Sequence, residues 1–361
     1  MRLLIAGGGT GGHLFPGIAV AEEVVRRGGQ VLFVGTSRGL EARTVPAAGY
    51  ALELLEVSGL KRMGMVATLR GLFRLPKAFF RSLAILRRFR PDVVLGVGGY
   101  ASGPMVLVAA LWRYPTAIQE QNSVPGITNR ILARLVRVVM IAFDETRRFF
   151  PGRKTETIGN PVRSKLVATL TAVADAGEQS ASPRILVVGG SQGARAVNDL
   201  VLAAVEVLAR SGSLPVLVHQ TGPSDKDRCS ERYRAMGAAD RVEVRPFIDD
   251  MATEYRRASL VIARAGALTL AELAIAGRPA ILIPLPTAAD DHQSKNAARF
   301  AAAGAAIVLN QRASSGAELA QLLGDLLTDA GRRQAMAAAM HSLARPKAAA
   351  EIVDRLERLT D

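Results

Sequence analysis

The sequence predicts an α/β protein of two domains, each built on a parallel β-sheet that helices cover on both faces. Short apolar runs alternate with helical segments from the first residue, which is the pattern of strands joined by helical crossovers. The alternation restarts after an irregular stretch near the middle of the chain. A length of 361 residues exceeds one ordinary core and fits two domains of typical size.

The first half carries strand signals separated by turns and helical segments. Strands are expected at residues 2–6, 30–34, 92–97, 116–119, 138–142 and 156–158. A helix is expected at residues 16–27, because Pro16 would then occupy its first turn, where the missing N–H costs no hydrogen bond.

The second half repeats the alternation after a linker. Residues 169–183 combine Ala, Thr, Ser, Gly and Pro with little periodicity, which predicts that linker. A helix is expected at residues 196–210, and strands are expected at residues 184–188, 216–219, 242–245, 260–263, 280–284 and 306–309. From Ala317 the chain is alanine-rich and helical, with Pro346 as a break before a last helix at residues 347–359.

Three glycine-rich turns follow predicted strands, at residues 7–13, 96–103 and 189–195. Glycine lets backbone N–H groups approach phosphate oxygens, and a helix that starts there adds the positive end of its dipole. Two of these turns open the two halves in similar ways. The sequence therefore predicts two phosphate-binding domains that face each other across a cleft.

The first turn does not fit the common nucleotide motifs. Gly7, Gly9 and Gly12 satisfy the dinucleotide fingerprint, but that site also needs an acid at the end of the second strand to hold a ribose. No acid follows this strand before Glu41, which disfavours an NAD or FAD domain. A P-loop is disfavoured because no Lys-Ser or Lys-Thr pair follows the glycines at the required spacing.

His13 is the titratable residue of the first turn. A histidine where a helix begins can orient a phosphate or take a proton near neutral pH. The alternative is a capping or packing histidine. Its place inside a phosphate-type turn favours the functional interpretation.

The second half holds a further cluster of polar residues. Thr269 is expected as an N-cap with Glu272 three residues on, the spacing of a capping box, although the same carboxylate could accept ribose hydroxyls. Residues 290–296 supply donors and acceptors for sugar hydroxyls. Asp225 and Asp227 resemble a metal-binding pair, but they stand among turn residues and are interpreted as a solvated loop.

The formal net charge of +14 calls for an anionic partner: nucleic acid, a membrane surface or a phosphorylated substrate. Residues 58–90 are basic and apolar without an acid. Residues 81–90 are expected to form a domain helix with a solvated arginine face. The stretch from Leu60 to Phe80, broken by Gly64, Gly71 and Pro76, is either another such helix or a contact with anionic lipid.

Cysteine usage and hydropathy limit the cellular compartment and the way the chain can associate with a membrane. Cys229 is the only cysteine, which excludes an internal disulfide and a cysteine-built zinc site and favours a reducing compartment. The N-terminus lacks the pattern of a signal peptide. The longest apolar run, residues 105–112, is far shorter than the roughly 20 residues that a membrane-spanning helix needs.

Motifs along nearly the whole chain resemble one family. They are Gly-Gly-Thr-Gly-Gly-His at 8–13, Gly-Gly-Tyr-Ala-Ser-Gly-Pro at 98–104, Glu-Gln-Asn at 120–122, Gly-Asn-Pro-Val-Arg at 159–163, Gly-Gly-Ser-Gln-Gly-Ala at 189–194 and Arg-Ala-Gly-Ala-Leu-Thr at 264–269. In this order they resemble the MurG family, the peptidoglycan N-acetylglucosaminyltransferases that convert lipid I into lipid II.

The resemblance implies a GT-B fold with two Rossmann-like domains, at residues 1–163 plus about 346–361 and at residues 164–345. It implies inverting transfer of N-acetylglucosamine from UDP-GlcNAc to the C4 hydroxyl of the muramyl sugar of lipid I, without metal or cofactor. Such an enzyme serves cell-wall biogenesis, and through it cell shape and division. It would lie peripherally on the cytoplasmic face of the bacterial plasma membrane, with the stretch from Leu60 to Phe80 on anionic lipid.

The resemblance also implies roles for individual residues. On the donor side it implies Arg163 and Ser191 for the phosphates, Phe247 and Ile248 for uracil, and Glu272 for the ribose. Sugar, diphosphate and other substrate contacts are expected from Thr10, Gly11, Gly12, Asn122, Ala267, Leu268, Thr269, Leu270, Ala271, Gln293 and Asn296. The acceptor pyrophosphate is expected on Gly9, Gly98, Gly99, Tyr100 and Ser102. His13 is the first candidate for the base, and Glu120 is a weaker one.

Two alternatives remain at this point. One is another nucleotide-sugar enzyme of the same fold, such as a glycolipid synthase or an epimerase. The other is a basic module without catalysis that binds nucleic acid or membrane. One tryptophan and five tyrosines offer few stacking side chains, and no recognised nucleic-acid motif is present, so no nucleic-acid partner is predicted.

Overall fold

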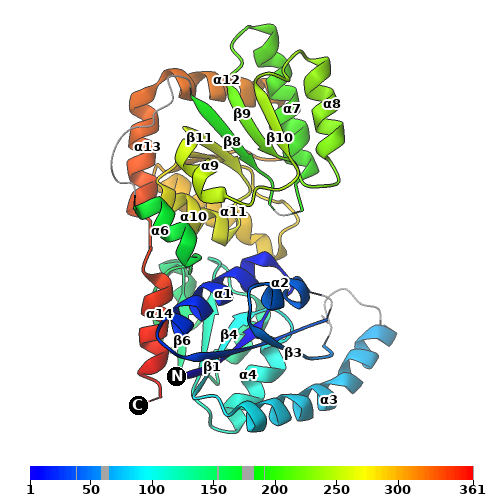
Figure 1. The fold of residues 1–361 in the computed structure, drawn as a ribbon, viewed down its shortest axis with the longest axis vertical. Coiled ribbons are helices and arrows are strands. Elements are labelled where there is room, and N and C mark those ends of the chain that lie inside the picture. Colours follow the sequence, from blue (N-terminus) through cyan, green and yellow to red (C-terminus); the bar gives the residue numbers. More distant parts are fainter. Residues whose placement is uncertain (38, 58–64, 153, 173–182, 191, 361) are drawn as a thin grey trace. The chain divides into compact units, whose positions relative to one another are not determined.

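A computed structural model describes residues 1–37, 39–57, 65–152, 154–172, 183–190 and 192–360, with the backbone alone for residues 65–75 (Figure 1). The chain divides into two compact units. The N-terminal unit comprises Met1–Ser164 and Arg345–Asp361, and the C-terminal unit comprises Lys165–Ala344.

The N-terminal unit is built on a seven-stranded parallel sheet of order β3-β2-β1-β4-β5-β6-β7. Its strands are β1 (Arg2–Gly7), β2 (Gln30–Gly35), β3 (Ala51–Leu54), β4 (Val93–Gly98), β5 (Thr116–Glu120), β6 (Val138–Ile141) and β7 (Thr155–Thr157). The six predicted strands are confirmed. Sequence analysis missed β3, an edge strand of four residues without a fully buried position.

Helices cover both faces of this sheet. They are α1 (Gly11–Arg26), α2 (Glu41–Ala47), α3 (Met65–Phe89), α4 (Ser102–Leu111), α5 (Ile127–Leu132), the 3₁₀ helix η1 (Asp144–Phe149) and α14 (Ala348–Glu357). Successive side chains of a strand point to opposite faces. Accordingly, Leu3 and Ile5 pack in one core with α1 and α14, whereas Leu4 and Ala6 pack in another with α3 and α4.

The helix expected at residues 16–27 is present as α1, but its predicted start was wrong, and so were the predicted breaks in α3. The helix α1 begins at Gly11, not at residue 16, so Pro16 lies inside it. Pro16 leaves the carbonyl of Gly12 without its helical partner, and Gly12 is exposed to water near the helix start. The helix α3 runs unbroken through Gly71 and Pro76, since Ile85 and Leu86 anchor it in the core; Gly64 lies outside the described residues.

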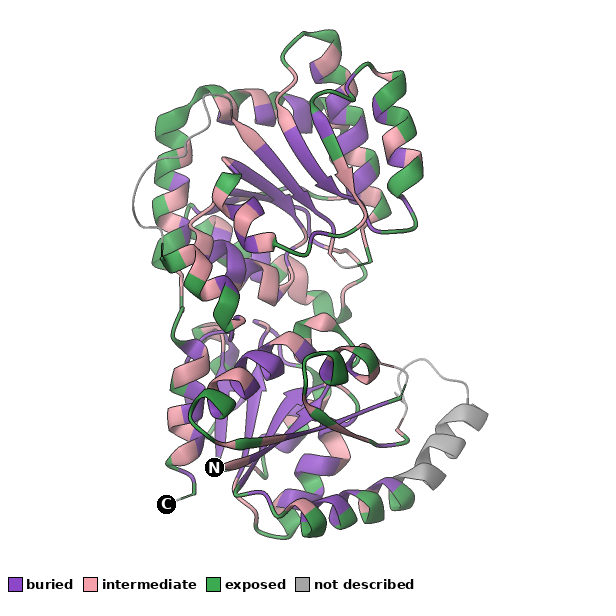
Figure 2. Cartoon of the chain, viewed as in Figure 1, coloured by how far each residue is buried: buried purple, intermediate pink, exposed green. Residues whose placement is uncertain are grey.

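The C-terminal unit is built on a six-stranded parallel sheet of order β10-β9-β8-β11-β12-β13. Its strands are β8 (Arg184–Val188), β9 (Val216–Gln220), β10 (Val242–Arg245), β11 (Leu260–Ala263), β12 (Ala280–Leu282) and β13 (Ala306–Val308). All six were predicted. Figure 2 shows buried residues along the strands of each sheet and exposed residues on the outer faces of the helices.

The helices of this unit follow the strands in alternation. They are α6 (Ser164–Thr171, which starts at the boundary), α7 (Arg195–Arg210), α8 (Lys226–Ala235), α9 (Met251–Arg257), α10 (Ala267–Ala276), η2 (Ala289–Asp291), α11 (His292–Ala302), α12 (Gly316–Thr328) and α13 (Ala330–Ser342). Of the predicted linker, residues 169–171 are the end of α6, and residues 173–182 lie outside the described residues.

Each sheet has one point where the strand order reverses direction. It lies between β1 and β4 in the N-terminal unit and between β8 and β11 in the C-terminal unit. Ligands of open α/β sheets bind at the carboxyl ends of the strands beside such a point. All three glycine turns follow one of these strands, and so does the turn that precedes α10.

Candidate functional site

The first two glycine turns contact each other at the reversal point of the N-terminal sheet. The N–H of Gly8 donates to the carbonyl of Gly98 across 3.3 Å. A Cβ on Gly99 would lie 2.2 Å from the carbonyl oxygen of Gly8, and both Gly98 and Gly99 have positive φ. Only glycine satisfies this approach and this backbone conformation, so the turns form one glycine-built platform.

The buried side chain of Glu41 binds the backbone of the first glycine turn. Its carboxylate is 1% exposed and accepts from the N–H of Gly9 at 2.7 Å, from the N–H of Thr36 at 2.8 Å and from the Thr36 hydroxyl at 2.7 Å. Cβ atoms on Gly8, Gly35 or Gly39 would lie within 2.4 Å of this side chain.

The charge of Glu41 is stabilised despite its burial. Burial raises the pKa of the carboxyl, but the hydrogen bonds from Gly9 and Thr36 outweigh it and hold the pKa below its usual value. Glu41, the first residue of α2, thus binds the glycine turn itself. Sequence analysis noted Glu41 only as lying too far after the second strand to fit the dinucleotide fingerprint.

His13 lies on the first turn of α1, half-buried beside the second glycine turn. Its Nδ1 is 3.0 Å from the Oε1 of Gln121, and a Cβ on Gly98 would lie 2.9 Å from Nδ1. The Nε2 of Gln121 donates to the carbonyl of Val97 at 2.9 Å and to the side chain of Gln119. These bonds fix the amide so that Oε1 faces the imidazole, which assigns the proton to Nδ1 and the free lone pair to Nε2.

Glu120 organises the turn that follows β5. It is 1% exposed, and its Oε1 accepts from the N–H of Asn122 at 3.0 Å. Its Oε2 accepts from the N–H of Gly126 at 3.2 Å and from the Nδ2 of Asn129 at 2.9 Å. Asn122 itself is half-buried, and its carbonyl accepts from the hydroxyl of Thr146 at 3.1 Å.

The remaining predicted residues of this unit differ in exposure. Tyr100 is 56% exposed, whereas Ser102 is fully buried with its hydroxyl facing Gly96. The guanidinium of Arg163 lies 5.1 Å from the ring centroid of Phe15, on α1, which places it near the first glycine turn. Its role on the donor phosphates stays a prediction.

The third glycine turn lies at the reversal point of the C-terminal sheet. Gly190 and Gly193 have positive φ, and the N–H of Gly193 donates to the carbonyl of Gly190 at 2.9 Å. A Cβ on Gly193 would lie 2.1 Å from the carbonyl oxygen of Thr221. Ser191 lies outside the described residues.

Gln220 connects this turn to the predicted uracil segment. Its Nε2 donates to the carbonyl of Gly190 at 2.9 Å, and its Oε1 accepts from the N–H of Ile248 at 3.2 Å. Ile248 is 2% exposed, whereas Phe247 is 49% exposed. Sequence analysis missed Gln220, and its position at the end of a strand beside a glycine turn was the available signal.

The helix α10 begins directly at the reversal point. Its N-cap is Gly266, so the prediction of Thr269 as the N-cap was wrong: Thr269 lies in the first turn, because the extended backbone ends at Gly266. Glu272 is 7% exposed, and its Oε2 accepts from the hydroxyl of Tyr255 at 3.0 Å. The N-terminus of α10 brings together the predicted residues Ala267, Leu268, Thr269, Leu270, Ala271 and Glu272.

Polar side chains from α11 hold the neighbouring backbone. Asn296 is fully buried, and its Nδ2 donates to the carbonyl of Ala265 at 3.3 Å, just before α10. The Oε1 of Gln293 accepts from the N–H of Leu285 at 3.0 Å. The predicted residues of α10 and α11 thus lie around one edge of the sheet.

A buried network supports the third glycine turn. His219 is fully buried between the hydroxyl of Tyr233 at 2.7 Å and the Oδ1 of Asn198 at 3.1 Å, and burial lowers its pKa to about 3. The Nδ2 of Asn198 donates to the carbonyl of Thr221 and to the Oδ2 of Asp225.

The interpretation of Asp225 as part of a solvated loop was therefore wrong. Asp225 is 8% exposed and precedes the first residue of α8. The hydrogen bond from Arg228 lowers its pKa to about 2. Within the described part of the chain, no group of three or more His, Cys, Asp or Glu side chains could hold a metal ion.

Sequence profiles of one glycosyltransferase family match both halves of the chain. Residues 3–141 match the glycosyltransferase family 28 N-terminal domain, and residues 184–355 match the glycosyltransferase family 28 C-terminal domain.

Similar proteins cover nearly the whole chain. A relative from Anaeromyxobacter dehalogenans (strain 2CP-C) is 51% identical over 98% of this chain and 92% of its own length. One from Myxococcus xanthus is 50% identical over the same shares. Both are named UDP-N-acetylglucosamine–N-acetylmuramyl-(pentapeptide) pyrophosphoryl-undecaprenol N-acetylglucosamine transferase. The crystal structure of MurG from Acinetobacter baumannii superposes with a TM-score of 0.80 at 33% identity, covering 99% of each chain.

Proposed function

The chain belongs to glycosyltransferase family 28, in the GT-B fold, and we propose that it performs the transfer for which its relatives are named. It moves N-acetylglucosamine from UDP-GlcNAc to undecaprenyl-pyrophosphoryl-MurNAc-pentapeptide, so that lipid I becomes lipid II in peptidoglycan synthesis. The observation that carries this conclusion is the identity of about half of the residues over nearly the full chain.

The C-terminal unit binds the donor at its reversal point. The third glycine turn receives the diphosphate, Ile248 lies against uracil, and Glu272 accepts from the ribose hydroxyls. Because Tyr255 already donates to one oxygen of Glu272 at 3.0 Å, the carboxylate is held in place before the ribose arrives. Gln293 and Asn296 hold the backbone around the sugar subsite.

Charge builds up on the leaving UDP as the bond to the anomeric carbon breaks. The N–H groups at the N-terminus of α10 are fixed before reaction, so they stabilise this charge more in the transition state than in the ground state. These groups supply what a metal ion supplies in other transferases.

The N-terminal unit binds the acceptor pyrophosphate on its glycine-built platform. The N–H of Gly9 is engaged by Glu41, so the platform offers phosphate the backbone of Thr10, Gly11 and Gly12 at the start of α1.

His13 is the base of the proposed reaction. Its Nε2 accepts the proton of the attacking C4 hydroxyl while Gln121 holds Nδ1. The attack inverts the anomeric carbon. Glu120 is the weaker candidate, because its two oxygens already accept from Asn122, Gly126 and Asn129.

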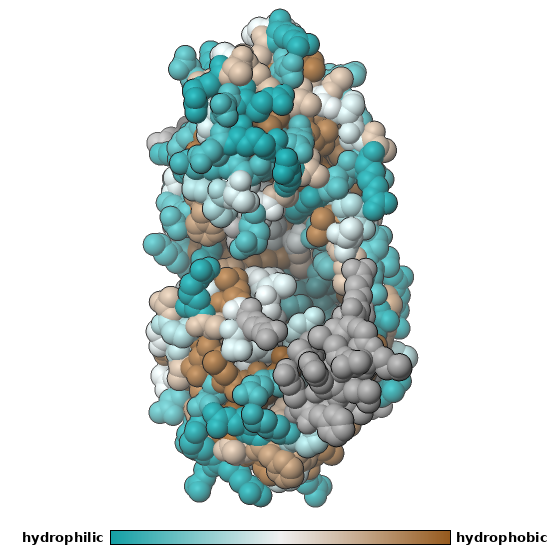
Figure 3. Space-filling model, turned by 90° about the vertical axis from the view of Figure 1, so that its right-hand side faces the viewer, coloured by the Kyte–Doolittle hydropathy of each residue, from teal (hydrophilic) through white to brown (hydrophobic). Residues whose placement is uncertain are grey.

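Membrane attachment involves an apolar surface on α3 and α4. Phe80 is 67% exposed, Leu107 37%, Leu111 55% and Trp112, which directly follows α4, 41%. Figure 3 shows patches of hydrophobic side chains among hydrophilic ones on the N-terminal unit. The ring centroid of Phe79 lies 5.4 Å from that of Trp112, which joins the two helices. In the described part of the chain no helix is suited to cross a bilayer, and we propose peripheral attachment to the cytoplasmic face of the plasma membrane.

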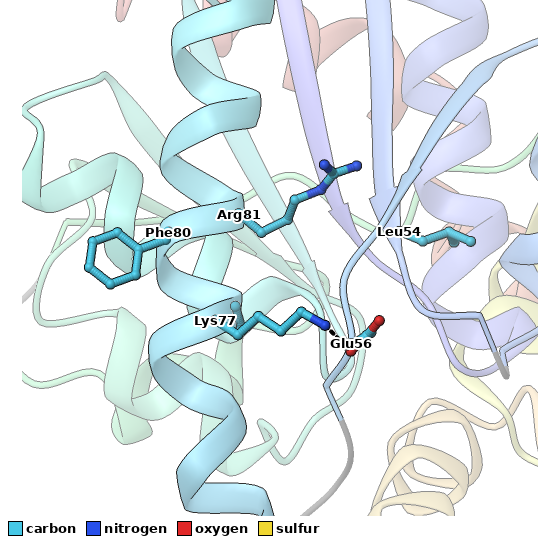
Figure 4. A pocket seen from close by; sticks show the side chains of 6 residues that line it. Leu54, Glu56, Lys77, Phe80 and Arg81 are labelled. Carbon is cyan, nitrogen blue, oxygen red and sulfur yellow. Dashed lines mark hydrogen bonds and ion pairs between the residues drawn. The ribbon is translucent and has the colours of Figure 1, made fainter.

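Acidic side chains from outside α3 partly balance the basic side chains of this helix. Lys77 pairs with Glu56 at 2.8 Å and Arg81 with Glu53 at 2.8 Å, beside a pocket of about 600 Å³ between α3 and the end of β3. Figure 4 shows the ring of Phe80 pointing away from the Lys77–Glu56 pair. Within the predicted stretch from Leu60 to Phe80, side chains up to Leu75 lie outside the described residues, so apolar contact through Phe80 carries the proposal.

The direct test is transfer of labelled N-acetylglucosamine from UDP to lipid I, with and without a chelator. We expect lipid II to form at the same rate in both samples. Failure to glycosylate lipid I, or transfer to another glycolipid instead, would contradict the proposal. Loss of activity with chelator would contradict its metal-independence.

A further inference from the structure

Gln220 lies where three parts of the donor side meet. It is the last residue of β9, and the strand order places β9 between β8 and β10. The third glycine turn follows β8, and Ile248 follows β10. Gln220 therefore stands between the subsites proposed for the diphosphate and for the base.

Its side chain binds both neighbours at once. The amide Nε2 donates to the carbonyl of Gly190 at 2.9 Å, and Oε1 accepts from the N–H of Ile248 at 3.2 Å. The side chain is 2% exposed, so neither bond competes freely with water. Only a carboxamide of this length supplies a donor on one side and an acceptor on the other.

The backbone around Gln220 makes the connection stiff. The N–H of Thr221 donates to the carbonyl of Arg245 at 3.0 Å, next to the base segment. On the other side, a Cβ on Gly222 would lie 2.5 Å from the carbonyl oxygen of Gln192 and one on Gly193 would lie 2.1 Å from that of Thr221. A shift of the glycine turn therefore moves the end of β9, and with it Ile248.

We propose that Gln220 is a positioning residue that sets the base subsite relative to the diphosphate subsite and so contributes to selection of uracil. The inference rests on the proposed function. The bond from its N–H to Gln220 fixes the backbone of Ile248, in the segment proposed for uracil. Uracil offers a donor at N3 where cytosine has an acceptor, so a base segment that shifts loses its preference between the two bases.

Two variants separate the two bonds of Gln220. Gln220→Met preserves the volume and removes both bonds. Gln220→Glu keeps an acceptor for the N–H of Ile248 but loses the donor to Gly190. The exposed Gln334, on α13, provides the matched control Gln334→Met.

The measurement is calorimetric titration of the full chain with UDP and with CDP. Leaving a buried polar group without its partner predicts about a tenfold loss in affinity for UDP in both Gln220 variants. The preference for UDP over CDP should fall in Gln220→Met and persist in Gln220→Glu, while Gln334→Met resembles the parent chain. In the transfer assay the KM for UDP-GlcNAc should rise and the KM for the lipid-linked acceptor should not.

A measurement on the unaltered chain covers the case in which the variants do not fold. Inorganic pyrophosphate alone should slow hydrogen exchange in the peptide that contains Ile248, because the turn and the base segment are joined through Gln220. Unchanged exchange there, or folded variants that bind UDP and CDP as the parent chain does, would overturn the role of Gln220. If the parent chain itself does not prefer UDP to CDP, the proposed donor site is wrong and this inference falls with it.

Discussion

The pair of Gln121 and His13 offers a test of the proposed base that leaves the imidazole in place. Gln121→Met removes the acceptor that faces Nδ1 at 3.0 Å and preserves the volume of the buried side chain. The proton of the neutral imidazole is then free to sit on either nitrogen. A base that must accept through Nε2 becomes less available, although the substrates bind as before.

The size of the effect follows from the bonds that are lost. One neutral hydrogen bond contributes about 0.5–1.5 kcal/mol, so loss of the His13 bond predicts a fall in kcat of about twofold to tenfold. His13→Ala removes the base itself and should cost about 10²–10⁴-fold. Gln121→Met also leaves the buried carbonyl of Val97 without its 2.9 Å bond, which predicts a lower melting temperature.

The assay is transfer of labelled N-acetylglucosamine to lipid I across a range of pH. In Gln121→Glu a carboxylate next to Nδ1 stabilises the imidazolium and should shift the acid limb of kcat to higher pH. The KM for UDP-GlcNAc should stay close to that of the parent chain in all variants. A His13→Ala variant with an unchanged rate, or a Gln121→Glu variant with an unmoved acid limb, would refute the assignment of His13 as the base.

Three further predictions concern the supports of the two sites and the membrane surface. Glu41→Ala should reduce turnover with the lipid acceptor and lower the melting temperature, since it leaves the buried donors of Gly9 and Thr36 without an acceptor. In the parent chain, the stability that the Glu41 carboxylate contributes is present above the usual carboxyl pKa and is lost as acid protonates Glu41. Melting temperatures measured against pH would show this loss in the parent chain and not in Glu41→Ala. The pKa of His219 is about 3 in the folded protein and near 6.5 in the unfolded chain. The free energy of unfolding of the C-terminal unit should therefore be unaffected by His219 above pH 6.5 and should fall by up to about 1.4 kcal/mol per pH unit between pH 6.5 and pH 3. A His219→Gln variant whose acid unfolding is just as steep would contradict this. Replacing Phe80 and Trp112 by serine should weaken sedimentation with anionic vesicles and spare activity on a soluble acceptor analogue, and equal sedimentation would count against the apolar surface.

Local patterns in the sequence predicted the strands well. Apolar runs bounded by turns identify strands of a parallel sheet because both faces of such a sheet are buried. The edge strand β3 was not predicted because its residues are partly exposed and do not form an apolar run. Helix boundaries were less predictable: Pro16 and Pro76 signal a helix start or break locally, but packing against the core keeps both inside helices.

The sequence by itself determined the fold class, the family and the places of the glycine turns proposed to bind phosphate, because glycine turns after buried strands are local signals and motif order is a property of the chain. The tertiary structure decided which side chains hold those turns. Glu41, Gln121 and Gln220 act through partners that lie far from them in the sequence or on other strands. Likewise, Glu53 and Glu56 reach the arginines and lysine of α3, so a stretch without acids in the sequence has acids beside it in space. Hydrogen bonds and ion pairs depend on distances of about 3 Å, and only the folded chain sets these distances.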